Sequence, residues 1–142
     1  MRLRAVFIAM VLAAAVSIRP YPADDLILRE DIAQGNALLV YAVTCDEAQA
    51  SPRWLPERAE PPLPLARAVA IARRWVRETV GYAGKTKVVS IELSPIESPD
   101  VRDRWFYSVG LVPSDAAQAP PAYLTTVVIL LNGKVVVPQI RH

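Results

Sequence analysis

The segment from Pro64 to Gly81 is the one long stretch of this sequence with clear helical periodicity. Its apolar residues recur at steps of three and four, which places them on one stripe of a helix. Pro64 suits the first helical position, and Gly81 suits the left-handed position just past the end. A stripe of this width needs a packing partner. Its members are Leu65, Ala68, Val69, Ala72, Trp75, Val76, Thr79 and Val80.

Four strand-like segments follow the helix and supply that partner. Residues 87–93 and 104–112 alternate in hydropathy, with Val89, Ile91 and Leu93 on one face of the first. Residues 122–131 are almost wholly apolar, which is typical of a strand covered on both faces. Asn132-Gly133 predicts a tight hairpin into a return strand at 134–139, where Pro138 marks an edge or an end. We therefore predict an α+β fold with one amphipathic helix packed on a four-stranded antiparallel meander.

An N-terminal hairpin is predicted to precede this unit. Residues 24–32 and 37–44 are apolar-rich, and Gln34-Gly35-Asn36 between them reads as a turn, although the first run also fits a short helix. Residues 45–63 form a proline-rich connector, with Trp54 expected to pack on the core. The sheet face opposite the helix must be covered by the hairpin, by the Trp54 connector or by a second copy of the chain.

The N-terminus has the pattern of a secretory signal peptide. Arg2 and Arg4 precede the apolar run at 5–18, and Ala15-Val16-Ser17 offers small residues for cleavage near residue 17. An uncleaved membrane anchor is the alternative. The predicted organisation is a signal peptide at 1–17, a hairpin region at 18–50, a connector at 51–63 and the helix with its sheet at 64–142. Residues 18–142 are expected to form one domain in the periplasm or outside the cell.

Removal of the signal changes the charge of the chain. The full sequence has a net charge of +2, but residues 18–142 contain 14 basic and 14 acidic side chains. A near-neutral chain gives no support for nucleic-acid binding. The charge is uneven, however, with a net of −4 over residues 18–64 and +4 over residues 65–142.

The sequence contains few candidates for catalysis or metal binding. His142 is the sole histidine and the last residue, and Cys45 is the sole cysteine, so we predict no catalytic residues, no metal site and no cofactor. Asp100 and Asp103 fit oxygen ligation of a cation, but Arg102 and Arg104 alternate with them, which favours a salt-bridged loop.

Two features remain as a possible interaction surface. Four arginines lie on the polar side of the predicted helix, and an aromatic run begins at Trp105. The arginines suit an anionic partner such as an acidic protein face, an acidic polymer or a membrane headgroup, and the alternative is an ordinary solvated helix face. The aromatic run suits a stacking platform, or alternatively the core. The candidate residues are Arg67, Arg73, Arg74, Arg77, Trp105 and Tyr107.

The order of these segments resembles PepSY-type domains and, more broadly, cystatin-like folds. The resemblance covers about residues 63–140 and rests on LARAVAIARRWV, KVVSIEL, RWFYSVGLV and LLNGKVVVP. It implies a helix packed on a curled antiparallel sheet, in an exported module that binds or modulates another protein, and it implies no catalytic residues.

We therefore expect a non-enzymatic binding module that acts on another, unidentified envelope protein. The first alternative is a homo-oligomeric envelope component joined through the second sheet face. The second is a small ligand-binding protein or enzyme built on a cystatin-like cone. A membrane contact is expected only if the N-terminal segment is not cleaved.

Overall fold

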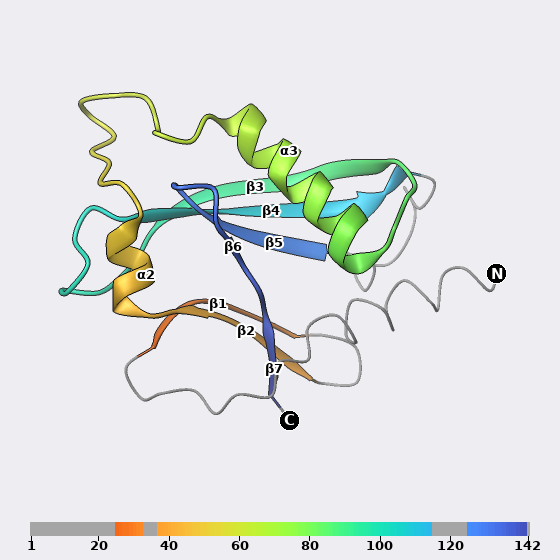
Figure 1. Cartoon of the computed structure of the whole chain (residues 1–142), viewed down its shortest axis with the longest axis horizontal. Coiled ribbons are helices and arrows are strands. Elements are labelled where there is room, and N and C mark those ends of the chain that lie inside the picture. Colours follow the sequence, from red (N-terminus) through yellow and green to blue (C-terminus); the bar gives the residue numbers. More distant parts are fainter. Residues whose placement is uncertain (1–24, 33–36, 115–124, 142) are drawn as a thin grey trace.

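The protein is described by a computed structural model over residues 25–32, 37–114 and 125–141. In this part of the chain, two antiparallel sheets and one long helix form three layers (Figure 1). The larger sheet has the order β3-β4-β5-β6 and the smaller one β1-β2-β7. The predicted α+β class is confirmed, and the predicted signal peptide lies outside the described residues. The strands are β1 Leu26–Ile32, β2 Leu38–Val43, β3 Thr86–Pro95, β4 Trp105–Pro113, β5 Thr125–Leu130, β6 Val135–Val136 and β7 Gln139–Arg141.

The long helix covers one face of the larger sheet. It consists of α3, Leu65–Trp75, continued by the π-helical turn η2, Val76–Val80. Buried positions recur every four residues. In an α-helix, each step of four residues moves the buried position by about 40° around the helix axis. A π turn contains more residues than an α turn, so η2 offsets this rotation and keeps the last buried position facing the sheet. The buried residues are Ala68, Ala72, Val76 and Val80.

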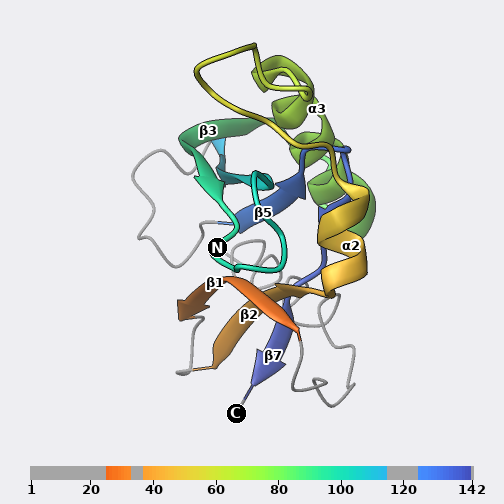
Figure 2. The ribbon, with the colours of Figure 1, turned by 90° about the vertical axis from the view of Figure 1, so that its left-hand side faces the viewer.

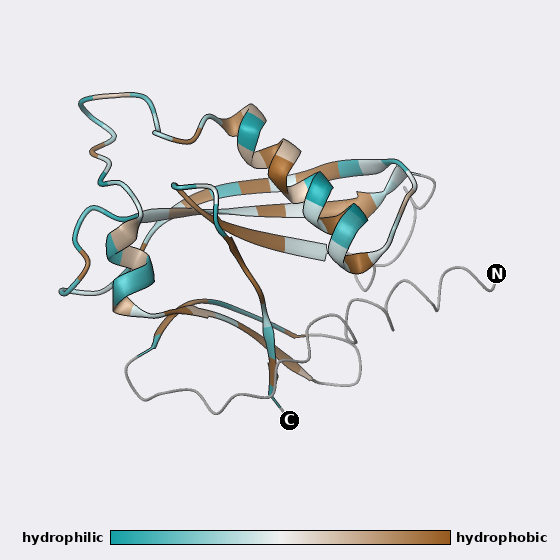
Figure 3. Cartoon of the chain, viewed as in Figure 1, coloured by the Kyte–Doolittle hydropathy of each residue, from teal (hydrophilic) through white to brown (hydrophobic). Residues whose placement is uncertain are grey.

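The ends of this helix differ in detail from the prediction. Gly81 ends it in the left-handed conformation, with φ 79°, as predicted. Pro64 is the N-cap and not the first helical residue. Leu65 and Thr79 belong to the predicted apolar stripe but are exposed. The buried stripe is therefore narrower than the predicted one. Figure 3 shows hydrophilic bands between hydrophobic ones along the helix.

The opposite face of the larger sheet is covered by the N-terminal hairpin. All residues of β5 are buried. Val127 and Ile129 pack toward the helix, whereas Val128 and Leu130 pack against a cluster that includes Tyr41 and residues of β1 and β2. The strand Thr125–Leu130 is thus covered on both faces, as predicted for the apolar run at 122–131, of which residues 122–124 lie outside the described residues. Of the three coverings expected for this face, the structure shows the chain's own hairpin.

The predicted return strand is divided at Pro138. The chain pairs with β5 only at β6, and it then crosses to the smaller sheet, where β7 pairs with β2 (Figure 2). Proline has no N–H to donate to a ladder, so the pairing with the larger sheet ends before it. The prediction of one continuous return strand at 134–139 is therefore wrong: the segment forms the end of one sheet and then joins the other. This crossing links the two sheets.

A second helix was not predicted. Residues Cys45–Ala50 form α2, within the segment predicted as a connector. A capping box starts the helix, because the Glu47 amide donates to Thr44 Oγ1 at 3.1 Å and the Thr44 amide donates to Glu47 Oε2 at 2.9 Å. Ala48 is fully buried in the cluster between the two sheets.

The rest of the connector is fixed to the core by Trp54, as predicted. The Trp54 and Trp105 rings meet edge to face, with centroids 5.0 Å apart. Trp54 Nε1 donates to the Ala59 carbonyl at 2.8 Å, and its amide donates to the Asp103 carbonyl at 2.9 Å.

The edge strand β3 contains a bulge. Its register with β4 shifts between Val88 and Ser90. The shift turns Val88 toward the helix side, where it packs against the core, and leaves Val89 49% exposed. The predicted single alternation over residues 87–93 is therefore broken at its start, while Leu93 packs on the helix side.

Candidate functional site: a basic pocket at the end of the long helix

The predicted interaction residues fall into two separate groups. Arg67, Arg73, Arg74 and Arg77 are all exposed on the long helix. The aromatic pair lies in the core instead. Tyr107 is 2% exposed, and its hydroxyl donates to the Leu63 carbonyl at 2.9 Å, while Trp105 is half-buried against Trp54. Trp105 and Tyr107 therefore serve packing, and the exposed candidates that remain are arginines.

Two of the four arginines line a pocket of about 460 Å³ at the C-terminal end of the helix. Arg73 and Arg77 stand one turn apart on its helical wall. We call this site the basic pocket. Its lining residues are Arg73, Arg77, Tyr82, Ala83, Gly84, Lys85, Thr86 and Ser114.

The floor of the basic pocket is built where the chain leaves the helix and enters the sheet. Gly81 adopts a left-handed conformation, which reverses the chain toward β3. The Ser114 amide donates to the Lys85 carbonyl at 2.8 Å, so the end of β4 is tied to the residue just before β3. The pocket is thus formed by the helix, by the short connection from Gly81 to β3, and by the residue that follows β4.

Gly84 is required by the position of the Tyr82 ring. A Cβ atom at residue 84 would lie 2.4 Å from both Cζ and the hydroxyl oxygen of Tyr82. Such an approach does not occur between real atoms, so any larger residue would displace the ring. The Tyr82 side chain also packs against the core under the helix. Glycine therefore allows the phenol to lie across the backbone at the pocket floor.

The charge of the basic pocket is one-sided. Its described lining contains three cations, Arg73, Arg77 and Lys85, and no carboxylate. None of the three forms an ion pair within the part of the chain that the structure describes. Hydroxyl groups of Tyr82, Thr86 and Ser114 add hydrogen-bonding capacity. Asp115 follows Ser114 in the sequence and lies outside the described residues.

Helix electrostatics account for only part of this arrangement. Cations near a helix C-terminus interact favourably with its partial negative charge, by about 0.3–1 kcal/mol each when exposed. Arg73 and Arg77, however, are a like-charge pair four residues apart, which costs a helix about 0.2–0.5 kcal/mol. Lys85 adds a third positive charge from outside the helix. The pocket is chemically suited to an anion, which would relieve this repulsion.

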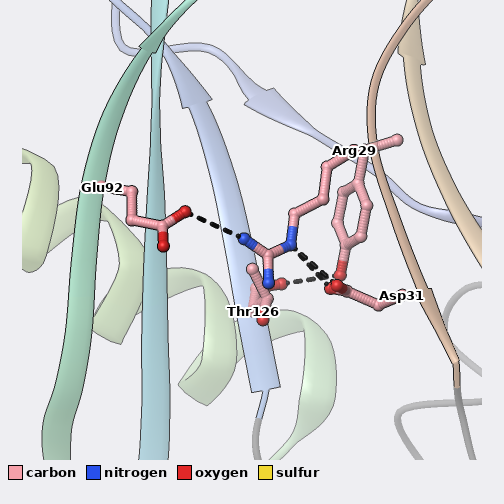
Figure 4. Close-up of polar contacts among 5 residues, drawn as sticks. Arg29, Asp31, Glu92 and Thr126 are labelled. Carbon is pink, nitrogen blue, oxygen red and sulfur yellow. Dashed lines mark hydrogen bonds and ion pairs between the residues drawn. The ribbon is translucent and has the colours of Figure 1, made fainter.

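A second hollow lies between the free edges of the two sheets, with a volume of about 370 Å³. Its basic side chain is already paired. Arg29 Nε contacts Asp31 Oδ1 at 2.8 Å, and Arg29 Nη1 reaches Glu92 Oε2 across the gap at 3.4 Å (Figure 4). This inter-sheet cleft is lined by Ile27, Leu28, Arg29, Glu92, Ser94, Pro95, Ile96, Glu97, Phe106 and Ser108.

Residues with shifted pKa values have structural explanations. Burial and the nearby Asp31 raise the pKa of Tyr41, whose hydroxyl donates to a backbone carbonyl. Burial also raises the pKa of Tyr107. A hydrogen bond from Lys134 lowers the pKa of Glu47. These contacts all lie away from the basic pocket.

Candidates for metal binding and nucleophilic catalysis are not brought together. Among the described residues, no three His, Cys, Asp or Glu side chains lie close enough to hold a metal ion. Cys45 is a half-buried free thiol at the start of α2. His142 lies outside the described residues. Within the described ranges, no helix is both long enough and apolar enough to span a bilayer.

Six of the eight residues that line the basic pocket were not expected from the sequence. Tyr82, Lys85, Thr86 and Ser114 were not singled out, and Ser114 joins the others only through the β3–β4 ladder. The sequence does indicate a basic site at residues 82–87, where two lysines and a threonine follow the glycine that ends the helix.

Comparisons with known proteins leave the resemblance to PepSY-type domains as a prediction from the sequence pattern. No protein-family model, no curated protein and no solved structure matches this chain.

Proposed function

We propose that this chain is an exported, non-enzymatic binding module that acts on another envelope protein and contacts it through the basic pocket. The observation that carries the proposal is the group of three cations, Arg73, Arg77 and Lys85, around one hollow with no acidic side chain in its described lining. Charge complementarity of this kind guides association and selects partners. The partner is expected to present an acidic group to the pocket.

Rigidity supports a recognition role for this site. The arginines project from the end of the helix, and Lys85 and Ser114 are joined by a backbone hydrogen bond. This bond fixes the connection between the helix and β3 at its strand end, and a preorganised site loses less conformational entropy on binding than a free loop. The inter-sheet cleft is a weaker candidate, because Asp31 and Glu92 already neutralise its arginine.

Two parts of the proposal, export and a non-enzymatic role, are supported by the sequence. The N-terminal pattern is that of a secretory signal, and the resemblance to PepSY-type domains implies a modulating module. The shifted pKa values of Tyr41, Glu47 and Tyr107 follow from packing and pairing contacts, which supports structural roles for these residues.

The proposal is tested by capture from the native envelope with a matched pair of variants. The tagged chain is compared with R73E/R77E and with R67E/R74E, which changes the charge equally on the same helix but outside the pocket. We expect one stoichiometric partner that is lost with R73E/R77E and retained with R67E/R74E. Equal loss of the captured partner with both double variants would show that the interaction is unspecific charge attraction. Capture of no partner in any sample would contradict the proposal.

A homo-oligomer remains the second candidate, now through the free edge of β3. This edge has no neighbour within the described sheet, and Val89 and Ile91 are 49% and 36% exposed on it. Exposed edges can pair with a second strand. Light scattering tests this candidate: a dimer at micromolar concentration that dissociates with V89K supports it, and a monomer removes it.

A further inference from the structure

We propose that the basic pocket binds a phosphate group in its doubly charged form, either free or as a monoester. The proposal deepens the proposed function, because it names the group that enters the same pocket, and it rests on that function for the location of the site. Its chemical content rests on the charges, the donors and the geometry of the described lining residues.

The charge of the pocket matches a dianion better than a monoanion. Three cations surround the hollow, and neither the lining nor an ion pair among the described residues compensates them. A single carboxylate would neutralise one of them and leave two facing each other. A phosphate monoester carries close to two negative charges at neutral pH. It would leave about one positive charge, which the surrounding water can solvate.

The arrangement of donors also suits a tetrahedral group. A planar carboxylate presents two oxygens, and one arginine fork can satisfy both. In the basic pocket the donors come from three places: Arg73 and Arg77 from the helix, Lys85 and Thr86 from the entry into β3, which begins at Thr86, and Ser114 from just after the end of β4. The terminal oxygens of a phosphate point in several directions, so such a group can contact all three walls.

The Tyr82 ring gives the site a defined floor. Its hydroxyl lies above Gly84, where a Cβ atom would collide with it. An arginine guanidinium can donate two parallel hydrogen bonds to the oxygens of one phosphate group. A hollow of about 460 Å³ also accommodates the small organic part of a monoester.

The test is titration calorimetry on the purified protein at constant ionic strength. Potassium phosphate, sulfate and acetate are compared at pH 8, and phosphate and sulfate are compared again at pH 5.5. We expect phosphate to bind at pH 8 and to weaken at pH 5.5, where it carries one charge. Sulfate remains a dianion and should bind about equally at both values. Acetate that binds as tightly as phosphate, or no heat from phosphate at 20 mM and pH 8, would overturn the proposal.

Variants locate the binding site. R73Q, R77Q and K85Q should each weaken phosphate binding by about tenfold or more, because each removes a charge-assisted contact. R67Q and R74Q are the matched controls and should leave the affinity within about twofold. Equal losses in the two groups would overturn the assignment to the pocket.

The source of the phosphate is decided by a second comparison. Glycerol 3-phosphate tests a soluble monoester, and vesicles of phosphatidylcholine with phosphatidic acid test a monoester headgroup. Binding of either one, lost with R73Q, supports the proposal and identifies the source. Equal binding to vesicles with phosphatidylglycerol, a singly charged diester, would contradict the preference for a dianion.

These outcomes are separate from failure of the proposed function. If envelope capture depends on Arg73 and Arg77 while phosphate gives no heat, the binding module stands and the ligand is wrong. If phosphate binds but no envelope protein is captured, the pocket is an anion site, and its role as a protein contact is contradicted.

Discussion

The hydroxyl of Tyr41 donates a 2.9 Å hydrogen bond to the backbone carbonyl of Thr126 and thereby joins the two sheets. Tyr41 lies on β2 of the smaller sheet and Thr126 on β5 of the larger one, and both residues are buried. Together with the strand that crosses at Pro138, this bond fixes the hairpin on the sheet face opposite the helix. The larger sheet in turn carries two walls of the basic pocket.

Replacement of Tyr41 by phenylalanine should destabilise the fold. The change removes the bond between the sheets while the ring still fills its place, so we expect a loss of about 1–2 kcal/mol in the free energy of unfolding. Urea denaturation at pH 7 measures it. An unchanged midpoint would show that packing alone holds the hairpin.

The same tyrosine should make the protein sensitive to alkali. Burial raises the pKa of the Tyr41 hydroxyl far above its ordinary value of 10.0. The folded state therefore favours the neutral hydroxyl. Its contribution to the free energy of unfolding is complete below pH 10 and declines as the pH rises above that value toward the folded pKa. We expect the free energy of unfolding to fall between pH 9.5 and 11.5, and to fall less steeply in Y41F. Parallel slopes would assign the effect to other groups.

Glu47 should have the opposite pH dependence. The hydrogen bond from Lys134 lowers the pKa of Glu47, with Thr44 contributing. Its stabilising effect is present above the unfolded value of 4.5 and is lost as the pH falls through the folded pKa. The pair is partly exposed, so the effect should stay below about 1 kcal/mol. Thermal melts from pH 3 to 6 should show a shallower slope for E47Q, which keeps a capping side chain, than for the parent chain.

Ser51 offers a stabilising change. The residue is 1% exposed, and its hydroxyl has no hydrogen-bond partner among the described residues. Removal of an unpaired buried polar group is favourable, so S51A should raise the free energy of unfolding by about 1 kcal/mol. A clear destabilisation would show that the hydroxyl is paired in solution.

Gly84 links the pocket to the Tyr82 ring. G84A should displace this ring and change the shape of the pocket floor, so we expect phosphate binding to weaken roughly fivefold. G133A is the matched control, because Gly133 has a φ of 86° but lies outside the pocket. It should lower stability while leaving phosphate affinity unchanged. Weaker binding in G133A than in G84A would contradict the role given to Tyr82.

The parts of the fold that were predictable from the sequence are those with a strong periodic signal. The helix ending at Gly81, the wholly apolar strand β5 and the Asn132-Gly133 turn each carry such a signal over a short distance. The capping box at Thr44 and Glu47 was equally local but precedes a helix of only six residues, with too few apolar positions to show a stripe.

Other features depend on contacts between distant residues. The bulge at Val88 and the passage of the last strand to the smaller sheet are decided by which strands pair, and hydropathy does not encode pairing. The basic pocket is similar. Arg73 and Arg77 were predicted on the polar side of one helix, but Lys85 and Ser114 join them only after β3 and β4 have aligned. The aromatic run at Trp105 suited a surface platform or the core, and Tyr107 is buried in the core.

The most direct measurement is site-specific photo-crosslinking in the native host. A photoreactive residue is placed at Ala83, an exposed and uncharged position in the basic pocket, and in a second strain at Leu65, which is 50% exposed at the far end of the helix. We predict one crosslinked envelope protein from position 83, lost when R73E/R77E is added, and none from position 65. Crosslinks to the same protein from position 65 alone, or from position 83 regardless of the arginines, would contradict the assignment of the basic pocket as the contact site.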